Sequence, residues 1–195
     1  GDNLRFYENS FTINKGGDTE ELTVRREVPE LDLLCENENR LWGCKGDTIY
    51  ASKLGDPFNW NVFDGVSTDS YAVDVGSAGD FTGCFAYRGY PVFFKEEQIY
   101  KVYGDKPSNF QVMSSASLGV EAGSHASLAI AGETLYYLSR VGVVAYSGGI
   151  PQSVAAPFGT DRYRNGVAGS DGVKYYVSLE DSTGGHTLFV YDTPK

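Results

Sequence analysis

The sequence predicts an all-β protein that is built like a β-propeller, with about four blades of antiparallel strands. Four tyrosines, Tyr50, Tyr100, Tyr146 and Tyr191, recur at spacings of 50, 46 and 45 residues. Each tyrosine ends an apolar stretch. Before that stretch come an earlier apolar run and then a turn. Strand repeats of about 40–50 residues are typical of propeller blades. The 24 glycines suit frequent tight turns, and the 14% aromatic content suits a packed core.

The repeats place the blades near residues 32–75, 80–115, 124–158 and 167–195. Within them the apolar residues alternate with a period of two, which indicates strands rather than helices. A helix of one or two turns is expected only near Pro157–Arg164. The expected blade core consists of apolar residues from every repeat: Leu41, Ile49, Val92, Ile99, Leu135, Val144, Tyr175 and Phe189.

The first blade has the longest predicted series of strands. Strands are expected over residues 32–36, 40–44, 48–52 and about Trp60–Phe63. An outer or crossing strand is then expected over residues 71–75. Pro57 lies between the third and fourth of these strands. A proline there blocks further ladder pairing after the third strand.

The N-terminal segment, residues 1–31, differs from the repeats. Two stretches of alternating polarity, 6–13 and 21–25, flank the turn residues 15–18, and this pattern predicts a hairpin. The last predicted strand, 187–191, is followed by four residues, so the fourth blade lacks an outer strand. Either the N-terminal segment supplies that strand, or the chain is a piece of a longer protein with an incomplete ring. We favour the second alternative, because four blades are few for a ring and open edges need cover.

Charge and hydropathy exclude some partners. The formal net charge is −10, with 26 acidic and 16 basic residues, whereas binding to a phosphate backbone needs a basic surface. We therefore expect no sequence-specific nucleic acid partner. The sequence contains no apolar run near the ~20 residues that a spanning helix needs, so no membrane partner is expected either.

The three cysteines, Cys35, Cys44 and Cys84, do not make a complete disulfide framework because their number is odd. Cys35 and Cys44 can be placed across neighbouring strands. We interpret all three as buried free thiols, which fits assembly in the cytosol.

Residues for metal or nucleophilic chemistry are sparse. Neither His125 nor His186 has a second histidine with which to share a metal, and the cysteine spacing does not fit a zinc site. The sequence has no Gly-x-Ser-x-Gly motif, and residues 148–151 lack the Lys-Ser/Thr of a phosphate loop. We therefore expect no catalytic residue, no metal site and no cofactor.

Paired carboxylates provide the enzyme alternative, a glycoside hydrolase. Some glycosidases are propellers, and two carboxyl groups about 5–9.5 Å apart can cleave a glycosidic bond. Asp32, Asp80, Glu133 and Asp171 are the candidates, because they lie near blade starts or inner turns. Aspartate is also favoured in turns, and 26 acidic residues make a chance pair easy to find. Turn capping is therefore the favoured interpretation.

Aromatic side chains are the candidates for a ligand site or a protein interface, since aromatic residues are enriched at interfaces. Five are singled out: Trp60, Tyr87, Tyr90, Tyr103 and Tyr163. Stacking on a glycan is one interpretation. Packing in the core or at an interface is favoured for most of them.

Two pairs of segments have a similar residue pattern. Residues 39–43 (Asn-Arg-Leu-Trp-Gly) precede 49–60, and residues 88–96 precede 98–104. Over roughly residues 28–195 the chain resembles propeller-type structural proteins of tailed bacteriophages and prophages. It is similar to the head–tail stabilisation and tail-nozzle proteins of short-tailed phages. The resemblance implies a virion protein that is assembled in the bacterial host cytoplasm and forms an oligomer with other phage structural subunits.

The prediction is therefore a non-enzymatic virion protein of the head–tail junction or tail, which acts through assembly and protein–protein contact. The alternative is a carbohydrate-binding or glycoside-hydrolase-like propeller, whose partner would be a glycan.

Overall fold

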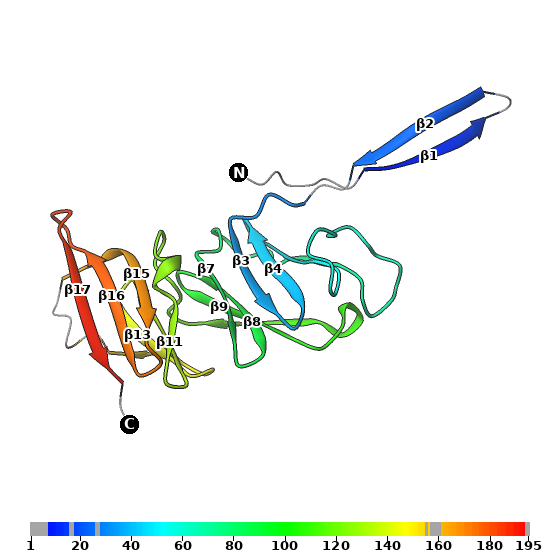
Figure 1. Ribbon diagram of the computed structural model, residues 1–195. Helices are drawn as coiled ribbons and strands as arrows, with labels where there is room; N and C mark the ends of the chain where they lie inside the picture. The colour runs from blue at the N-terminus through cyan, green and yellow to red at the C-terminus, as the bar shows by residue number, and fades with distance from the viewer. Residues whose placement is uncertain (1–7, 16–17, 26–27, 155, 157–160, 194–195) are drawn as a thin grey trace.

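The computed structural model describes residues 8–15, 18–25, 28–154, 156 and 161–193. Its four antiparallel sheets of consecutive strands are arranged as the blades of a β-propeller (Figure 1), which confirms the predicted fold class. No described helix is long and apolar enough to cross a membrane.

Each blade is a meander whose strands pair in chain order. The first blade contains β3 (Leu33–Asn37), β4 (Arg40–Lys45), β5 (Thr48–Ala51) and β6 (Tyr71–Asp74). The second contains β7 (Gly83–Tyr87), β8 (Tyr90–Lys95), β9 (Gln98–Tyr103) and β10 (Gln111–Ala116). The third contains β11 (Ala129–Ala131), β12 (Thr134–Ser139), β13 (Gly142–Tyr146) and β14 (Gln152–Ser153). The fourth contains β15 (Arg164–Ser170), β16 (Lys174–Glu180) and β17 (His186–Asp192).

Two short 3-10 helices, η1 (Pro107–Asn109) and η2 (His125–Ser127), lie in the connections. Of the expected helix near Pro157–Arg164, residues 157–160 lie outside the described residues. Residues 161–163 form neither helix nor strand, and β15 starts at Arg164.

Tight turns set the register at the start of the first two blades. Glu38 and Asn39, between β3 and β4, have φ angles of 51° and 59°. Positive φ at both central residues is the mark of a two-residue type I′ turn, whose twist matches that of the flanking strands. Asn37 therefore pairs directly with Arg40. Residues 88–89 make the same kind of turn between β7 and β8.

The core is divided among three apolar clusters, one between each pair of consecutive blades. Strand alternation sends every second side chain to one face of a sheet, so an inner blade can contribute to two clusters. The members include, from the first interface to the last, Trp42, Ile49, Phe93, Phe94, Leu135, Tyr137, Leu138, Tyr175 and Val177.

Most of the expected core residues are buried. Leu41 and Phe189 are only half-buried. Leu41 lies on the opposite face of β4 from Trp42, which packs against the second blade, and Phe189 lies on the edge strand β17. The buried members of the expected core are Ile49, Val92, Ile99, Leu135, Val144 and Tyr175.

The predicted strand over Trp60–Phe63 is wrong, because residues 52–70 form a long loop between β5 and β6. The buried Arg40 guanidinium holds this loop by donating to the backbone carbonyls of Ser52 and Ser67, both at 2.8 Å, and of Asp69. These bonds tie both ends of the loop to β4. The outer position of the blade is taken by β6 instead.

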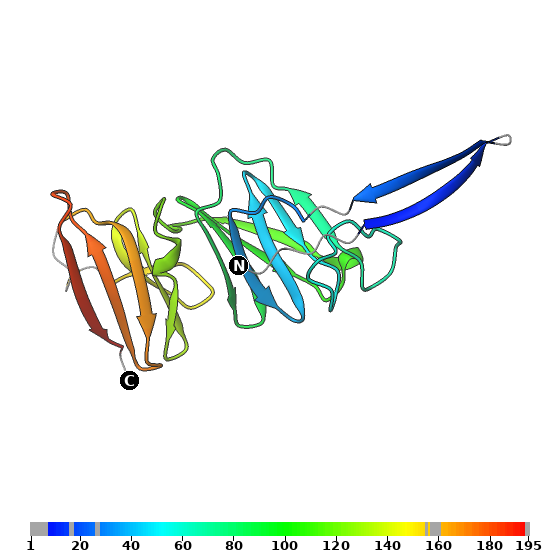
Figure 2. The ribbon, with the colours of Figure 1, turned by 45° about the horizontal axis from the view of Figure 1, so that its top comes forward.

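The N-terminal strands β1 (Glu8–Lys15) and β2 (Asp18–Arg25) pair only with each other among the described residues. Their hairpin extends away from the blades in both views (Figures 1 and 2). In the part of the chain that the structure describes, β17 pairs with β16 alone, so the hairpin does not supply the outer strand of the fourth blade. The first and fourth blades lie at opposite ends of the row in both views.

Candidate functional site

Three of the five candidate aromatic residues, Trp60, Tyr87 and Tyr163, are buried within the chain. Trp60 is a buried residue of the 52–70 loop and donates its indole N–H to the carbonyl of Pro57 at 2.9 Å. Tyr87 lies between the second and third blades, with its ring 5.6 Å from that of Tyr146. Both side chains therefore stabilise the fold from inside and offer little surface to a ligand.

Tyr90 and Tyr103 are the two candidates that the structure brings together. They lie on the neighbouring strands β8 and β9, and their ring centroids are 5.1 Å apart. The Lys101 ammonium lies 3.9 Å from the Tyr90 ring centroid and 4.8 Å from that of Tyr103. This is a cation–π cluster at the surface, with Tyr103 38% exposed. A stacking sugar would have to displace the lysine from these ring faces.

Tyr163 is buried where the third and fourth blades meet. Its ring makes an edge contact with Phe189, at 5.6 Å between centroids. The residue belongs to the same apolar cluster as Tyr175 and Val177. Its position therefore supports blade packing.

The four candidate carboxylates lie in turns or at the starts of four different blades. Asp32 pairs with Lys45 at 2.7 Å. Asp171 caps the β15–β16 turn by accepting the backbone N–H groups of Lys174 and Val173 and the hydroxyl of Tyr176. Those bonds, the Lys174 N–H first, lower the Asp171 pKa to about 2. A general acid needs a raised pKa, so Asp171 is suited to capping instead.

Asp80 and Glu133 are also exposed. Asp80 lines a groove beside Lys95, near the start of the second blade. Glu133 lies in the β11–β12 turn, where its backbone carbonyl accepts the Tyr87 hydroxyl at 2.6 Å. The two residues line different grooves.

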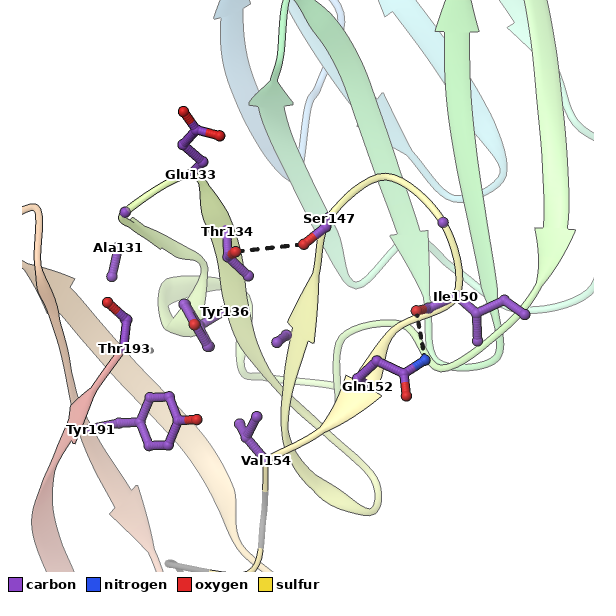
Figure 3. Close-up of a pocket in the computed structure, with 13 residues that line it drawn as sticks. Ala131, Glu133, Thr134, Tyr136, Ser147, Ile150, Gln152, Val154, Tyr191 and Thr193 are labelled. Atoms are coloured by element: carbon purple, nitrogen blue, oxygen red, sulfur yellow. Dashed lines mark hydrogen bonds between the residues drawn. The ribbon is translucent and has the colours of Figure 1, made fainter. Parts of the chain in front are cut away.

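A pocket of about 400 Å³ lies between the third and fourth blades (Figure 3). Tyr136 and Tyr191 form one wall, with ring centroids 5.6 Å apart. Thr134 and Ser147 face each other across the upper part, with their hydroxyl oxygens 3.5 Å apart. Glu133 is the one carboxylate among the described lining residues, and its side chain points away from the pocket in Figure 3. The pocket offers aromatic and hydroxyl surface but no facing pair of acids.

The fourth blade leaves large apolar side chains exposed on one face. Val167, Leu188 and Val190 are 58%, 67% and 53% exposed. Register places Leu188 beside Ser178 and Val190 beside Tyr176, on the side of the sheet that points away from the third blade. We call the stripe formed by Val167, Tyr176, Leu188 and Val190 the fourth-blade outer face.

Charged pairs border this face. Lys174 and Asp192 are 3.0 Å apart at one end, and Arg164 and Glu180 are 2.9 Å apart at the other. An apolar centre with a polar rim is the usual anatomy of a protein–protein interface. Strand β17, which carries Leu188 and Val190, has β16 as its only described partner. Its other edge is therefore open, and an open strand edge can accept a further strand.

The 52–70 loop exposes a second group of apolar residues. It is an ordered loop of unusual length for a compact domain, and long ordered loops often have functional roles. Sequence reasoning missed it because the aromatic residues of this stretch suggested a strand. Phe58, Trp60 and Val62 alternate with asparagines as in a strand, so this stretch carried no local signal of a loop. The exposed residues are Leu54, Phe58, Phe63 and Val66.

Neither models of known protein families nor curated protein sequences match the chain.

Proposed function

We propose that this chain is a structural protein of a tailed bacteriophage or prophage particle, at the head–tail junction or in the tail. It acts by assembly, and its partners are other structural subunits of the virion. The observation that carries the proposal is the fourth-blade outer face, where Val167, Leu188 and Val190 remain exposed on neighbouring strands. The resemblance of the repeats to phage propeller proteins supports the choice of particle.

The second and third blades bury apolar side chains on both faces, because each is packed between two neighbours. The fourth blade has the same alternation but buries only the face that carries Tyr175, Val177 and Leu179. Exposed apolar patches of this kind mark interaction sites on soluble proteins. Docking of another subunit's sheet would give the outer face the environment that the inner blades already have.

Light scattering across a concentration series tests the assigned face. We expect the mass of the chain to rise with concentration. The double variant Leu188→Lys/Val190→Lys should remain monomeric, because association would bury two charges. Val141→Lys is the matched control, since Val141 is 50% exposed but lies in the β12–β13 turn of the third blade. Equal association by the double variant and the wild type would exclude this face.

The virion role is tested on particles. Phage or induced-prophage particles from the source cells can be purified on a density gradient, and heads can then be separated from tails. Mass spectrometry should find the chain in a constant ratio to the tail and junction proteins. A chain that stays in the soluble cell fraction and is missing from purified particles would refute the proposal.

A further inference from the structure

The interface between the first and second blades contains three thiols. Cys35 lies on β3, Cys44 on β4 and Cys84 on β7, and β3 and β7 run side by side (Figure 1). The sulfur atoms of Cys35 and Cys84 are 3.0 Å apart, although 49 positions separate these residues in the chain. All three residues belong to or pack against one apolar cluster.

The separation of the two sulfur atoms is close to that of a cross-link. A disulfide bond is about 2.05 Å long, so the two sulfur atoms need to approach by only about 1 Å. Pairing within the sheets holds both residues in place, because Cys35 is opposite Trp42 and Cys84 is opposite Phe93. The sulfurs therefore meet through the packing of two rigid blades.

Access differs among the three thiols. Cys35 is half-buried, whereas Cys44 and Cys84 are almost fully buried. Burial raises the pKa of Cys84, and it raises the pKa of Cys44 to about 12. Because the thiolate is the nucleophile in exchange, Cys35 is the residue that reacts first with a reagent from solvent.

We propose that Cys35 and Cys84 are a disulfide-forming pair that links the first blade to the second. The oxidant is a low-molecular-weight disulfide. The Cys35 thiolate attacks one sulfur of this reagent, forms a mixed disulfide and releases one small thiolate. Cys84 then gives its proton to solvent and attacks the Cys35 sulfur, which releases the second small thiolate. Two protein thiols are oxidised, one small disulfide is reduced to two thiols, and Cys44 stays a thiol.

The cross-link has a structural consequence. It closes a loop that contains the whole of the first blade from β3 onwards, and a closed loop limits the freedom of the unfolded chain. The oxidised protein should therefore melt at a higher temperature than the reduced one. This chemistry does not depend on the proposed virion role. Cytosolic thiols stay reduced, whereas oxidising surroundings favour the bond.

Peptide mapping of the chain tests the proposal directly. The folded protein is incubated with oxidised glutathione, the remaining thiols are alkylated after unfolding in denaturant, and trypsin is added after dilution without a reductant. Cleavage after Lys and Arg separates the three cysteines into peptides 27–40, 41–45 and 54–88. We expect peptide 27–40 to be linked to 54–88, with 41–45 alkylated.

Single-cysteine variants identify which two thiols are linked. They also distinguish the effect of the cross-link from a general effect of oxidation. Cys44→Ser should keep the cross-link and the rise in melting temperature on oxidation. Cys35→Ser should lose both, and it disturbs the core less than a change at Cys84 would, because Cys35 is half-buried and Cys84 is buried. Alkylation of all three cysteines after oxidant treatment would overturn the proposal. So would a link between peptides 27–40 and 41–45.

Discussion

The Tyr87 hydroxyl donates a hydrogen bond to the backbone carbonyl of Glu133 at 2.6 Å, and this bond crosses from the second blade to the third. Tyr87 ends β7, whereas Glu133 lies in the turn between β11 and β12. The same carbonyl also accepts a longer bond from Arg88 at 3.4 Å. The end of one hairpin is thus anchored to the turn of the next, beside the apolar contact of Tyr87 with Tyr146.

Tyr87→Phe should remove this interblade hydrogen bond while keeping the ring contact. We expect a loss of about 1 kcal/mol in the free energy of unfolding, as for a typical buried hydrogen bond. The melting temperature should fall by roughly 2–4 °C in a chain of this size. Tyr103→Phe is the matched control, since Tyr103 is an exposed tyrosine of the same blade. Equal melting of the wild type and Tyr87→Phe would show that this bond contributes nothing.

Arg40→Met should release the 52–70 loop. The variant leaves the buried carbonyl groups of Ser52 and Asp69 without their charged donor. We expect destabilisation of about 3 kcal/mol, because hydrogen bonds to buried charged groups are among the stronger ones. Trypsin should also cut faster after Lys53 in the loop.

Arg140→Met is the control for the loss of an arginine. Arg140 pairs with Glu97 at the surface, and exposed pairs contribute only about 0–1 kcal/mol. Chemical denaturation of both variants gives the comparison. If Arg40→Met and Arg140→Met lose equal stability, the loop is held by its other contacts.

Asp171→Asn should change the pH dependence of stability. The pKa of Asp171 is lowered to about 2 in the folded chain, below the ordinary value of about 3.9 in the unfolded chain. Its contribution is therefore present above the unfolded pKa and is lost as the pH falls through the folded pKa. At pH values above about 4, we expect the melting temperature of the variant to be lower than that of the wild type. This difference in melting temperature should vanish as the pH falls towards 2. A gap that stays constant from neutral pH to pH 2 would contradict this assignment; thermal melts at several pH values decide.

Gly119→Ala should be strongly destabilising. A Cβ atom at this position would lie 1.7 Å from the backbone carbonyl oxygen of Lys95, and the backbone cannot move away without losing the bond from Gly119 N–H to Glu96. We expect a loss of about 3 kcal/mol or more, because overpacking against backbone is poorly relieved. Gly149→Ala, with no atom within 4 Å of the added carbon, should be nearly neutral. Thermal melts of the two variants side by side test the pair, and a wild-type melting point for Gly119→Ala would disprove it.

The sequence predicted the blades well because their signal is local. Alternating apolar residues between turn residues specify a strand and its two faces without reference to the rest of the chain. The repeat spacing could therefore predict four blades, and Ile49, Val92 and Leu135 could be assigned to the core. The same reasoning mispredicted a strand within the 52–70 loop. The conformation of this loop depends on hydrogen bonds from Arg40, a residue of an earlier strand.

The candidate site was less predictable, because aromatic residues serve a core and a surface equally well. Trp60, Tyr87 and Tyr163 are buried, whereas Tyr103 is exposed, and no local feature separates them. Leu188 and Val190 alternate in the same way as core residues. Their exposure depends on whether another sheet lies beyond the fourth blade.

The sequence by itself determined the strand content, the repeat and the acidic charge, because these follow from residue type and spacing along the chain. Only the tertiary structure decided which face of each blade is covered. It also decided that Cys35 meets Cys84 and not Cys44, at a sulfur separation of 3.0 Å. The physical reason is that packing between blades joins residues nearly fifty positions apart, and such contacts leave no periodic trace in the sequence.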